Sequence, residues 1–381
     1  MINLPYFFRQ IVHRLNGRVV HLKPQSKLRG NVLISYTTLP YLDRRQIVLD
    51  AHTNRWECMQ IARTFLEHGY AVDIIDHDNM RFVPKKNYAY FVGAHTNFDH
   101  IAPLLNPDCI KIFHGATCHW KFLNDAEQAR LDAIEERRGV RLAPIRALGH
   151  NHAIELCDVA IMLGNDATLS TYPKVNKRIE HIPLSTTHIY PSPKDRDFEK
   201  VRKNFIWFGG AGLAHKGVDL VLEAFASMPE YTLTLVGKID PADPFVQAYK
   251  REMYELPNIK TIGWLDPGSV QFKDICAKSL GLVYPSCSEG CAGSVVLCMH
   301  AGLIPIVSRE SGVDTGSFGV TLRDNSVESI REVVRTLAKA SVSELQKRAA
   351  DSWSYARANH TRDRFAQVFG EFVDTLEKSK K

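Results

Sequence analysis

Residues 208–225 have the sequence FGGAGLAHKGVDLVLEAF, the most informative segment of the chain. It passes from a short apolar strand through a glycine-rich loop into a helix. Gly209, Gly210 and Gly212 let the backbone approach a ligand closely. Lys216 stands near the start of the helix, where free N–H groups and the helix dipole favour anions. The stretch therefore predicts a βα unit that can bind a phosphate.

The spacing of this loop leaves a second interpretation open. It is neither the Walker A pattern nor a GxGxxG loop followed by an acidic residue on the second strand. A tight turn between a strand and a helix would use the same glycines without any ligand.

Short apolar runs alternate with helical stretches along the whole chain, which is typical of parallel βαβ units. They lie at 31–37, 71–76, 88–93, 109–115, 159–164 and 178–184, and again at 204–210, 232–237, 259–264, 279–286, 304–308 and 320–323. Prolines and charges break the pattern at 185–200, which we expect to be a linker. The sequence therefore predicts an α/β protein with two consecutive Rossmann-like domains.

From this pattern we expect four parts. They are a basic arm at 1–30, an N-terminal Rossmann-like domain at 31–190, a C-terminal Rossmann-like domain at 191–351 and a last helix at 352–381.

The positive charge is concentrated in the arm. The chain has 48 Lys and Arg against 42 Asp and Glu, and residues 1–30 contain six basic and no acidic residues, so the remainder balances. A nucleic-acid-binding protein would spread its basic residues over a face or groove, so we expect no nucleic-acid partner. Residues 1–20 could form a short helix on an anionic membrane surface, or could pack on the protein itself.

Apolar runs and cysteine spacing predict the cellular location of the protein and whether it binds a metal. No apolar run approaches the roughly 18 residues of a membrane-spanning helix, and the first residues lack a signal-peptide pattern. We therefore expect a cytoplasmic protein, at most peripheral on the inner face of the membrane. The eight cysteines show no CxxC pair and no His at zinc-finger spacing, so we expect no metal site.

A second informative stretch is YPSCSEGCAGSVVLCMHAGLIPIVS, residues 284–308. It contains a strand end, a loop with Glu289 and a helix at about 291–301. In an open α/β sheet this carboxylate and helix N-terminus would face the crevice at the carboxyl ends of the strands. By itself, a Glu in a loop is more often an ordinary solvated charge.

In order and spacing, these segments resemble the GT-B glycosyltransferases of the retaining group 1 family, also numbered family 4. The matching motifs are Gly209, Lys216-Gly217, LVG (235–237), NIKTIGW (258–264), SCSEG (286–290) and the run from Met299 through Gly302 to Pro305. The match covers about 204–320, and the N-terminal half matches in outline. The resemblance implies a GT-B fold, in which two Rossmann-like domains face each other across a cleft and the last helix crosses back to the first domain.

The resemblance also implies a donor site. In such proteins the residue at Lys216 neutralises the donor diphosphate, and the residue at Glu289 binds hydroxyls of the transferred sugar. The donor-binding positions are then Gly209, Gly210, Lys216, Gly290, Gly293, Ser294 and Val295. A Lys and a helix N-terminus can stabilise the charge of the leaving group without a metal, so no cofactor is expected.

The resemblance places the acceptor against the N-terminal domain. It puts His114, at the end of the run CIKIFHGAT, beside the reaction centre, whereas a His after a strand is by itself more often structural or solvated. His52, Asn54 and Arg55 fall in the first βα loop and could contact an acceptor or a phosphate. Helix capping by Thr53 or Asn54 is the alternative.

Two positions depart from the family pattern. The family usually has an Arg six residues before the Lys, where this chain has Gly210. It also has a second Glu that holds the nucleotide ribose, where this chain has Leu297, which cannot accept a hydrogen bond from a diol. The candidates to compensate are Lys238, Ser294, Glu310 and Asp314.

The sequence therefore predicts a metal-independent, retaining glycosyltransferase. It would move a hexose from a nucleotide-diphosphate sugar to a glycan or lipid-linked acceptor, as in polysaccharide biosynthesis. Two alternatives stay open: a GT-B epimerase that acts on a nucleotide sugar without an acceptor, and a non-catalytic GT-B binding or scaffold protein.

Overall fold

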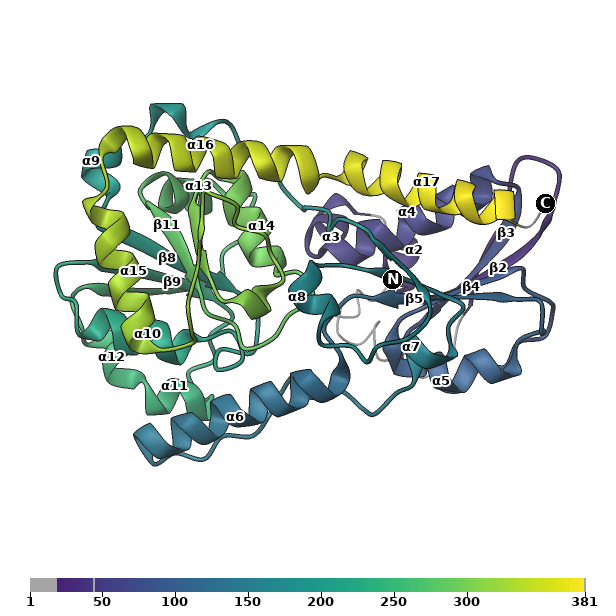
Figure 1. Ribbon diagram of the computed structural model, residues 1–381, viewed down its shortest axis with the longest axis horizontal. Coiled ribbons are helices and arrows are strands. Elements are labelled where there is room, and N and C mark those ends of the chain that lie inside the picture. The colour runs from purple at the N-terminus through teal and green to yellow at the C-terminus, as the bar shows by residue number, and fades with distance from the viewer. Residues whose placement is uncertain (1–18, 44, 380–381) are drawn as a thin grey trace, which may run out of the picture.

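The computed structural model describes residues 19–43 and 45–379 and shows two α/β domains arranged end to end (Figure 1). Most of the segment predicted to meet a membrane, residues 1–18, therefore lies outside the described residues. Among the described helices, none combines the length and the apolar character that crossing a membrane requires.

The first domain is built on a sheet in which seven described strands run in the order β1-β3-β2-β4-β5-β6-β7. The strands are β1 (Val20–Leu22), β2 (Gly30–Tyr36), β3 (Tyr70–Asp76), β4 (Tyr90–Gly93), β5 (Ile110–Gly115), β6 (Val159–Met162) and β7 (Arg178–His181). All neighbours are parallel except β1 and β3. The central strands are apolar almost throughout because helices cover both faces of the sheet.

Short and long helices connect these strands. They are α2 (Leu39–Leu42), α3 (Gln46–Asp50), α4 (Thr53–Glu67), α5 (His95–Ile101), α6 (Trp120–Arg138), α7 (Ala153–Leu156), α8 (Asp166–Leu169) and the 3-10 turn η1 (Ala102–Leu104). The strand β1 was not expected, because residues 20–30 were assigned to the basic arm. It pairs with β3, and His21 Nδ1 lies 2.7 Å from the Asp73 carboxylate, so this part of the segment belongs to the first domain.

The second sheet has the order β10-β9-β8-β11-β12-β13, with all described neighbours parallel. Its strands are β8 (Asn204–Gly209), β9 (Thr232–Gly237), β10 (Ile259–Gly263), β11 (Gly281–Tyr284), β12 (Ile304–Val307) and β13 (Val320–Thr321). In chain order this is the 3-2-1-4-5-6 arrangement, whose order reverses between β8 and β11. Open α/β sheets bind ligands outside the carboxyl ends of the strands at that reversal.

The remaining helices follow the same alternation. They are η2 (Pro193–Asp195), α9 (Phe198–Val201), α10 (Val218–Ala226), α11 (Pro244–Ala248), α12 (Lys250–Tyr254), α13 (Val270–Ala277), α14 (Gly293–His300), η3 (Arg309–Ser311), α15 (Val327–Lys339), α16 (Val342–Asn359) and α17 (Arg362–Ser379).

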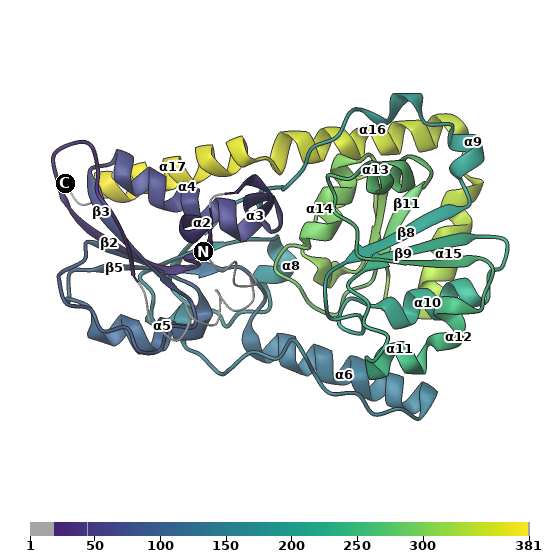
Figure 2. The ribbon, with the colours of Figure 1, turned by 180° about the vertical axis from the view of Figure 1, so that it is seen from behind.

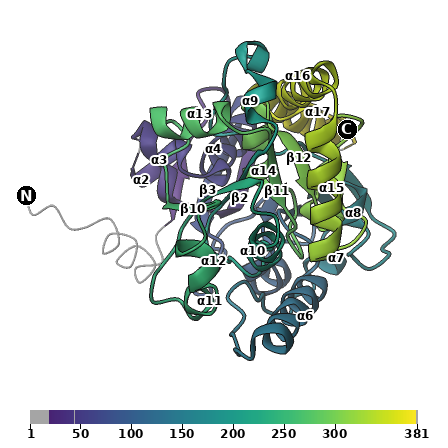
Figure 3. The same cartoon turned by 90° about the vertical axis from the view of Figure 1, so that its left-hand side faces the viewer.

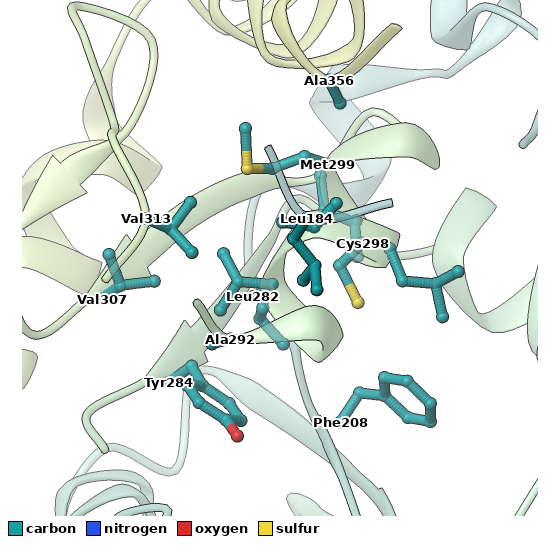
Figure 4. Packing of buried hydrophobic residues seen from close by; sticks show 14 of the residues in the cluster. Leu184, Phe208, Leu282, Tyr284, Ala292, Cys298, Met299, Val307, Val313 and Ala356 are labelled. Carbon is teal, nitrogen blue, oxygen red and sulfur yellow. The ribbon is translucent and has the colours of Figure 1, made fainter. Parts of the chain in front are cut away.

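An apolar layer supports the loops at the carboxyl edge of the second sheet (Figure 4). Leu282 and Tyr284 of β11 pack with Cys298 and Met299 of α14, and Leu184 from the end of the first domain joins them. All of these side chains are buried. The strand end that precedes the Glu289 loop is therefore held rigidly against α14.

The C-terminal segment forms two helices rather than the expected one. Helix α16 begins at Val342 and lies on the second domain, and α17 crosses to the first domain (Figures 1 and 2). The break falls at His360, whose Nδ1 lies 3.1 Å from the carbonyl oxygen of Leu184. The Thr361 hydroxyl then accepts the N–H of Arg364 at 3.0 Å and caps α17. The crossing therefore touches the chain just where it leaves the first domain.

Helix α17 is fixed to the first domain by an apolar face and one buried carboxylate. Phe369 meets Phe65 of α4 with ring centroids 6.1 Å apart. Near the end of α17, Glu377 Oε1 accepts the hydroxyls of Tyr70 at 2.7 Å and Tyr90 at 2.6 Å, and Oε2 pairs with Arg29. These contacts join the last helix to the strands β2, β3 and β4.

We predict that Glu377→Ala destabilises the protein by about 1–3 kcal/mol, because it leaves two buried tyrosine hydroxyls without their acceptor. Urea unfolding followed by circular dichroism measures the effect. Glu371→Ala, on the exposed side of the same helix, is the matched control and should stay within about 0.5 kcal/mol of the parent. Equal effects of the two substitutions would contradict the role given to Glu377.

Candidate functional site

The loops after β8 and β11 meet at the point where the strand order of the second sheet reverses. Gly217 has a φ of +75°, and a Cβ added there would lie 2.3 Å from the carbonyl oxygen of Pro285. Only glycine allows both this conformation and this approach. The Lys216 N–H donates to the Gly212 carbonyl at 2.9 Å, so Lys216 lies in the turn before α10 and not in the helix.

Lys216 and Glu289 form a buried ion pair between these loops. Lys216 Nζ lies 2.6 Å from Glu289 Oε1, and the two side chains are only 9% and 11% exposed. The same Oε1 accepts the Tyr284 hydroxyl at 3.1 Å and the Ser286 hydroxyl at 3.4 Å. No described residue bonds to Oε2, which remains an available acceptor beside the cation.

The charges around Glu289 keep it ionised. Burial alone would raise the pKa of its carboxyl group, but the positive charges of Lys216 and then Arg146 outweigh burial and lower that pKa to about 2. Lys216 Nζ also lies 5.7 Å from the centre of the Tyr284 ring, whose face attracts a cation. Glu289 is therefore a carboxylate at neutral pH, fixed beside Lys216.

The first turn of α14 lies next to this pair in the chain. The first N–H groups of a helix have no partner within it, which fits the prediction that Gly293 and Ser294 can cradle phosphate oxygens. Val295 differs, because its N–H donates to the Ala292 carbonyl at 2.9 Å.

The structure places Gly290 at the contact between the domains. A Cβ added there would lie 2.4 Å from the Ala116 carbonyl oxygen, and the Gly290 carbonyl accepts the Thr168 hydroxyl at 2.5 Å. Gly209 ends β8 against the Trp207 ring, whereas a Cβ on Gly210 would meet no described atom within 4 Å. Of these three predicted positions, Gly210 has the most open surroundings.

His114 occupies the end of β5 in the first domain and is 1% exposed. Neither ring nitrogen has a hydrogen-bond partner among the described residues, and the ring lies 4.8 Å from that of Tyr36. Burial, followed by the neighbouring His95, lowers the pKa of His114 to about 4. The ring is therefore neutral at physiological pH, and unpaired buried nitrogens of this kind are unusual enough to suggest a functional use.

The other predicted residues of the first domain cap or brace helix α4. His52 is its N-cap and accepts the Asn54 N–H at 3.3 Å, so neither Thr53 nor Asn54 fills the capping position that we expected as the alternative. Asn54 Oδ1 is buried without a partner among the described residues. Arg55 Nη1 donates to the Val48 carbonyl at 2.7 Å and so links α4 to α3.

His52 lies within electrostatic reach of Lys216, in the loop after β8. His52 is exposed, and the loss of hydration around its ring, followed by the positive charges of Arg55, Arg146 and Lys216, lowers its pKa.

The residues proposed to compensate for Leu297 are spread out. Leu297 itself is buried in α14. Asp314 accepts the Asn165 amide at 2.9 Å, and Glu310 accepts the Asn325 amide at 3.2 Å. Lys238 lies over the Trp264 ring at 5.7 Å, and both line a hollow of about 390 Å³ that also includes Gly212. Of these candidates, Lys238 therefore adjoins the glycine-rich loop.

Within residues 19–43 and 45–379, no three His, Cys, Asp or Glu side chains come together in a way that could hold a metal ion. The absence of a metal requirement stays a prediction.

Sequence reasoning missed a strong connection between the two halves. Helix α6, from the first half of the chain, extends beneath the second domain beside α10, α11 and α12 (Figures 1 and 3). Asp219 of α10 is fully buried and accepts Arg130 at 3.2 Å and Arg137 at 2.7 Å. Arg138 pairs with Glu252 of α12 at 3.0 Å. The charge run at the end of α6 was the available signal, but its partners are more than 80 residues away.

Residues 202–340, which contain the loops after β8 and β11, match the protein family described as "Glycosyl transferases group 1". The resemblance inferred from the sequence is confirmed. The matched segment runs from β8 to α15 and forms a group 1 glycosyltransferase domain that covers little more than a third of the chain. No curated protein matches the chain by sequence.

Solved structures extend the likeness to both domains. Sucrose-phosphate synthase from Thermosynechococcus elongatus is 14% identical with a TM-score of 0.61, over 92% of this chain and 99% of that one. WaaG, a glycosyltransferase involved in lipopolysaccharide biosynthesis, is 16% identical with a TM-score of 0.54, over 89% and 98%. Anabaena Alr3699/HepE in complex with UDP and glucose is 11% identical with a TM-score of 0.53, over 92% and 99%. The chain has the GT-B fold, as predicted.

A buried carboxyl group lies where the chain leaves the first domain of this GT-B fold. Glu57 of α4 is fully buried, and its Oε1 accepts both the N–H of Ser185 at 3.0 Å and the Ser185 hydroxyl at 2.8 Å. Burial raises the pKa of Glu57 from 4.5 to about 7, although the bonds from Ser185 oppose the shift. The start of the expected linker is thus attached to a group that titrates near neutral pH.

We predict that this group makes stability decrease as pH rises through 7. Between pH 4.5 and 7 the folded chain binds more protons at Glu57 than the unfolded chain, so its contribution is complete below pH 4.5 and lost above 7. Urea unfolding at pH 5, 6, 7 and 8 should show the parent losing roughly 1–3 kcal/mol more than Glu57→Gln, which resembles the protonated acid. Parallel pH profiles of the two proteins would contradict the assignment.

Proposed function

We propose that the protein is a retaining glycosyltransferase that moves a hexose from a nucleotide-diphosphate sugar to a glycan or lipid-linked acceptor without a metal. The observation that carries the proposal is the buried Lys216–Glu289 pair at the strand reversal of the second sheet. The match of that domain to group 1 glycosyltransferases supports the reaction class. UDP and glucose bound to a protein of similar fold support the class of donor.

Lys216 and Glu289 would bind different parts of the nucleotide-diphosphate sugar. An ammonium group has three donors, so Lys216 can keep its bond to Glu289 Oε1 and donate to a phosphate oxygen as well. Glu289 Oε2 can accept a hydroxyl of the sugar. As the bond from the sugar to the diphosphate breaks, negative charge grows on the leaving group, and Lys216 with the first turn of α14 would stabilise it.

The acceptor would approach from the first domain, where His114 ends β5. A neutral imidazole can hydrogen-bond a hydroxyl group through either nitrogen, as donor or acceptor. We assign His114 to orient the sugar or the acceptor hydroxyl rather than to carry a positive charge.

The donor site is tested by calorimetry with UDP, GDP and ADP and their sugar conjugates. We expect at least one nucleoside diphosphate and its sugar conjugate to bind. Lys216→Met should weaken the binding of these ligands by about 10-fold to 100-fold, since charge-assisted hydrogen bonds contribute about 1.5–3 kcal/mol. Lys260→Met, at an exposed position on β10, is the matched control and should change nothing.

Because removing Lys216 alone leaves Glu289 buried without a counter-charge, the double variant Lys216→Met with Glu289→Gln is the folded reference. Binding of no nucleotide by the parent protein would overturn the proposal in favour of a scaffold. Conversion of the sugar nucleotide without an acceptor would indicate an epimerase. Transfer that stops when metal is chelated, or that inverts the anomeric configuration, would refute those two parts of the proposal.

His114→Asn should lower kcat by about 100-fold while leaving donor affinity within about twofold, because the ring acts on the reacting groups and not on the nucleotide. In the parent protein, the acid limb of the kcat profile should fall near pH 4 and not near 6.5, since burial lowers the pKa of His114 to about 4. Steady-state kinetics across pH 4 to 8 measure both. Unchanged kcat in the variant would refute the role of His114.

A further inference from the structure

The segment after α6 is held firmly against that helix. It turns at Gly139, which has a φ of +66° and ends α6. The buried Glu127 then accepts the N–H groups of Ile145 at 3.2 Å and Arg146 at 3.1 Å. Asn124 exchanges two hydrogen bonds of 2.8 Å with the backbone of Leu148. Residues 139–149 are thus placed by α6, which is itself docked on the second domain by its arginines.

This segment brings Arg146 to the glycine-rich loop. A Cβ added to Gly212 would lie 3.3 Å from Arg146 Cγ and 3.4 Å from its Cδ, so the stem of the arginine covers the glycine. The preceding Ile145 lines the hollow that includes Gly212, Lys238 and Trp264. Arg146 therefore lies on the loop that leads directly into Lys216.

A short chain of contacts joins Arg146 to the ion pair. Glu127, which holds the Arg146 backbone, lies 3.8 Å from His215 Nδ1, and His215 Nε2 lies 2.6 Å from the Ser288 carbonyl oxygen. His215 and Ser288 are the neighbours of Lys216 and Glu289 in the sequence.

The Arg146 guanidinium group is available to bind a ligand. It makes no side-chain hydrogen bond or ion pair with any described residue, and its charge reaches the Glu289 carboxylate and the His52 ring. The arginines of α6 itself are different, because Arg130, Arg137 and Arg138 are all paired with carboxylates.

We propose that, in the donor site described above, Arg146 is a second phosphate-binding cation, which the first half of the chain supplies to the second domain. A guanidinium group presents a planar fork of donors that matches two phosphate oxygens. The ligand it recognises is the diphosphate of the nucleotide, so Arg146 discriminates by phosphate number and not by base.

The test compares nucleotides that differ only in phosphate number. Calorimetry is done with whichever of UDP, GDP and ADP binds the parent protein most tightly, and with the corresponding monophosphate and nucleoside. Arg146→Gln and Arg146→Met remove the charge but keep a stem over Gly212, so one folded variant of the two is enough. Thermal unfolding confirms the fold of each variant.

We expect each charge-removing variant to bind the diphosphate about 10-fold to 100-fold more weakly and the nucleoside unchanged. Arg146→Lys, which retains charge but not the fork, should recover part of the loss. Arg141→Gln removes the same charge from an exposed position in the same segment and should bind like the parent.

Unchanged diphosphate affinity in a folded charge-removing variant would overturn the role of Arg146 and leave the proposed function standing. An equal loss for diphosphate and nucleoside, or an equal loss in Arg141→Gln, would also overturn it. If the parent protein binds none of UDP, GDP and ADP, both the proposed function and this inference are removed.

Discussion

The structure of the site depends on one buried ion pair. Two charges taken out of water are tolerated when each has the other and further polar contacts. Glu289 also accepts the hydroxyls of Tyr284 and Ser286, and the Lys216 ammonium group lies over the Tyr284 ring. The pair forces the loops after β8 and β11 to stay together, and Gly217 is the residue that allows their backbones to approach. The geometry of the candidate site and the stability of the two loops thus depend on the same ion pair.

The two domains are joined by an exchange of helices. The second half of the chain sends α17 onto the first domain, where Glu377 is held by two tyrosines and Arg29. The first half sends α6 onto the second domain, where Asp219 is held by two arginines. Both anchoring carboxylates are buried. The candidate site consequently involves both halves of the chain, because the segment that follows α6 lies on the glycine-rich loop of the second domain.

The sequence predicted those features of the structure that are determined by short segments of the chain. The period of apolar residues predicted both sheets, and the spacing around Lys216 and Glu289 predicted two residues that the structure places 2.6 Å apart. These signals are local because a loop that follows a strand has its position fixed by the strand. Residues 20–30 were assigned to the basic arm because β1 has only three residues, which is too short for an alternation of apolar residues to be recognised.

The contacts that were not predicted join positions far apart in the chain. Arg137 and Asp219 are 82 residues apart, and Glu57 and Ser185 are 128 apart. Nothing near Arg146 in the sequence indicates that its stem will cover Gly212. These contacts can be recognised only when the packing of the helices on the domains is known. From the sequence alone, a charged residue is expected to be solvated.

The most direct measurement is a crystal structure of the protein with the nucleoside diphosphate that it binds. We expect the diphosphate to be bound by Lys216 Nζ, the Arg146 guanidinium and the first turn of α14, with Glu289 Oε2 facing the position of the sugar. A diphosphate held elsewhere, with the Lys216–Glu289 pair making no contact to it, would contradict the central claim.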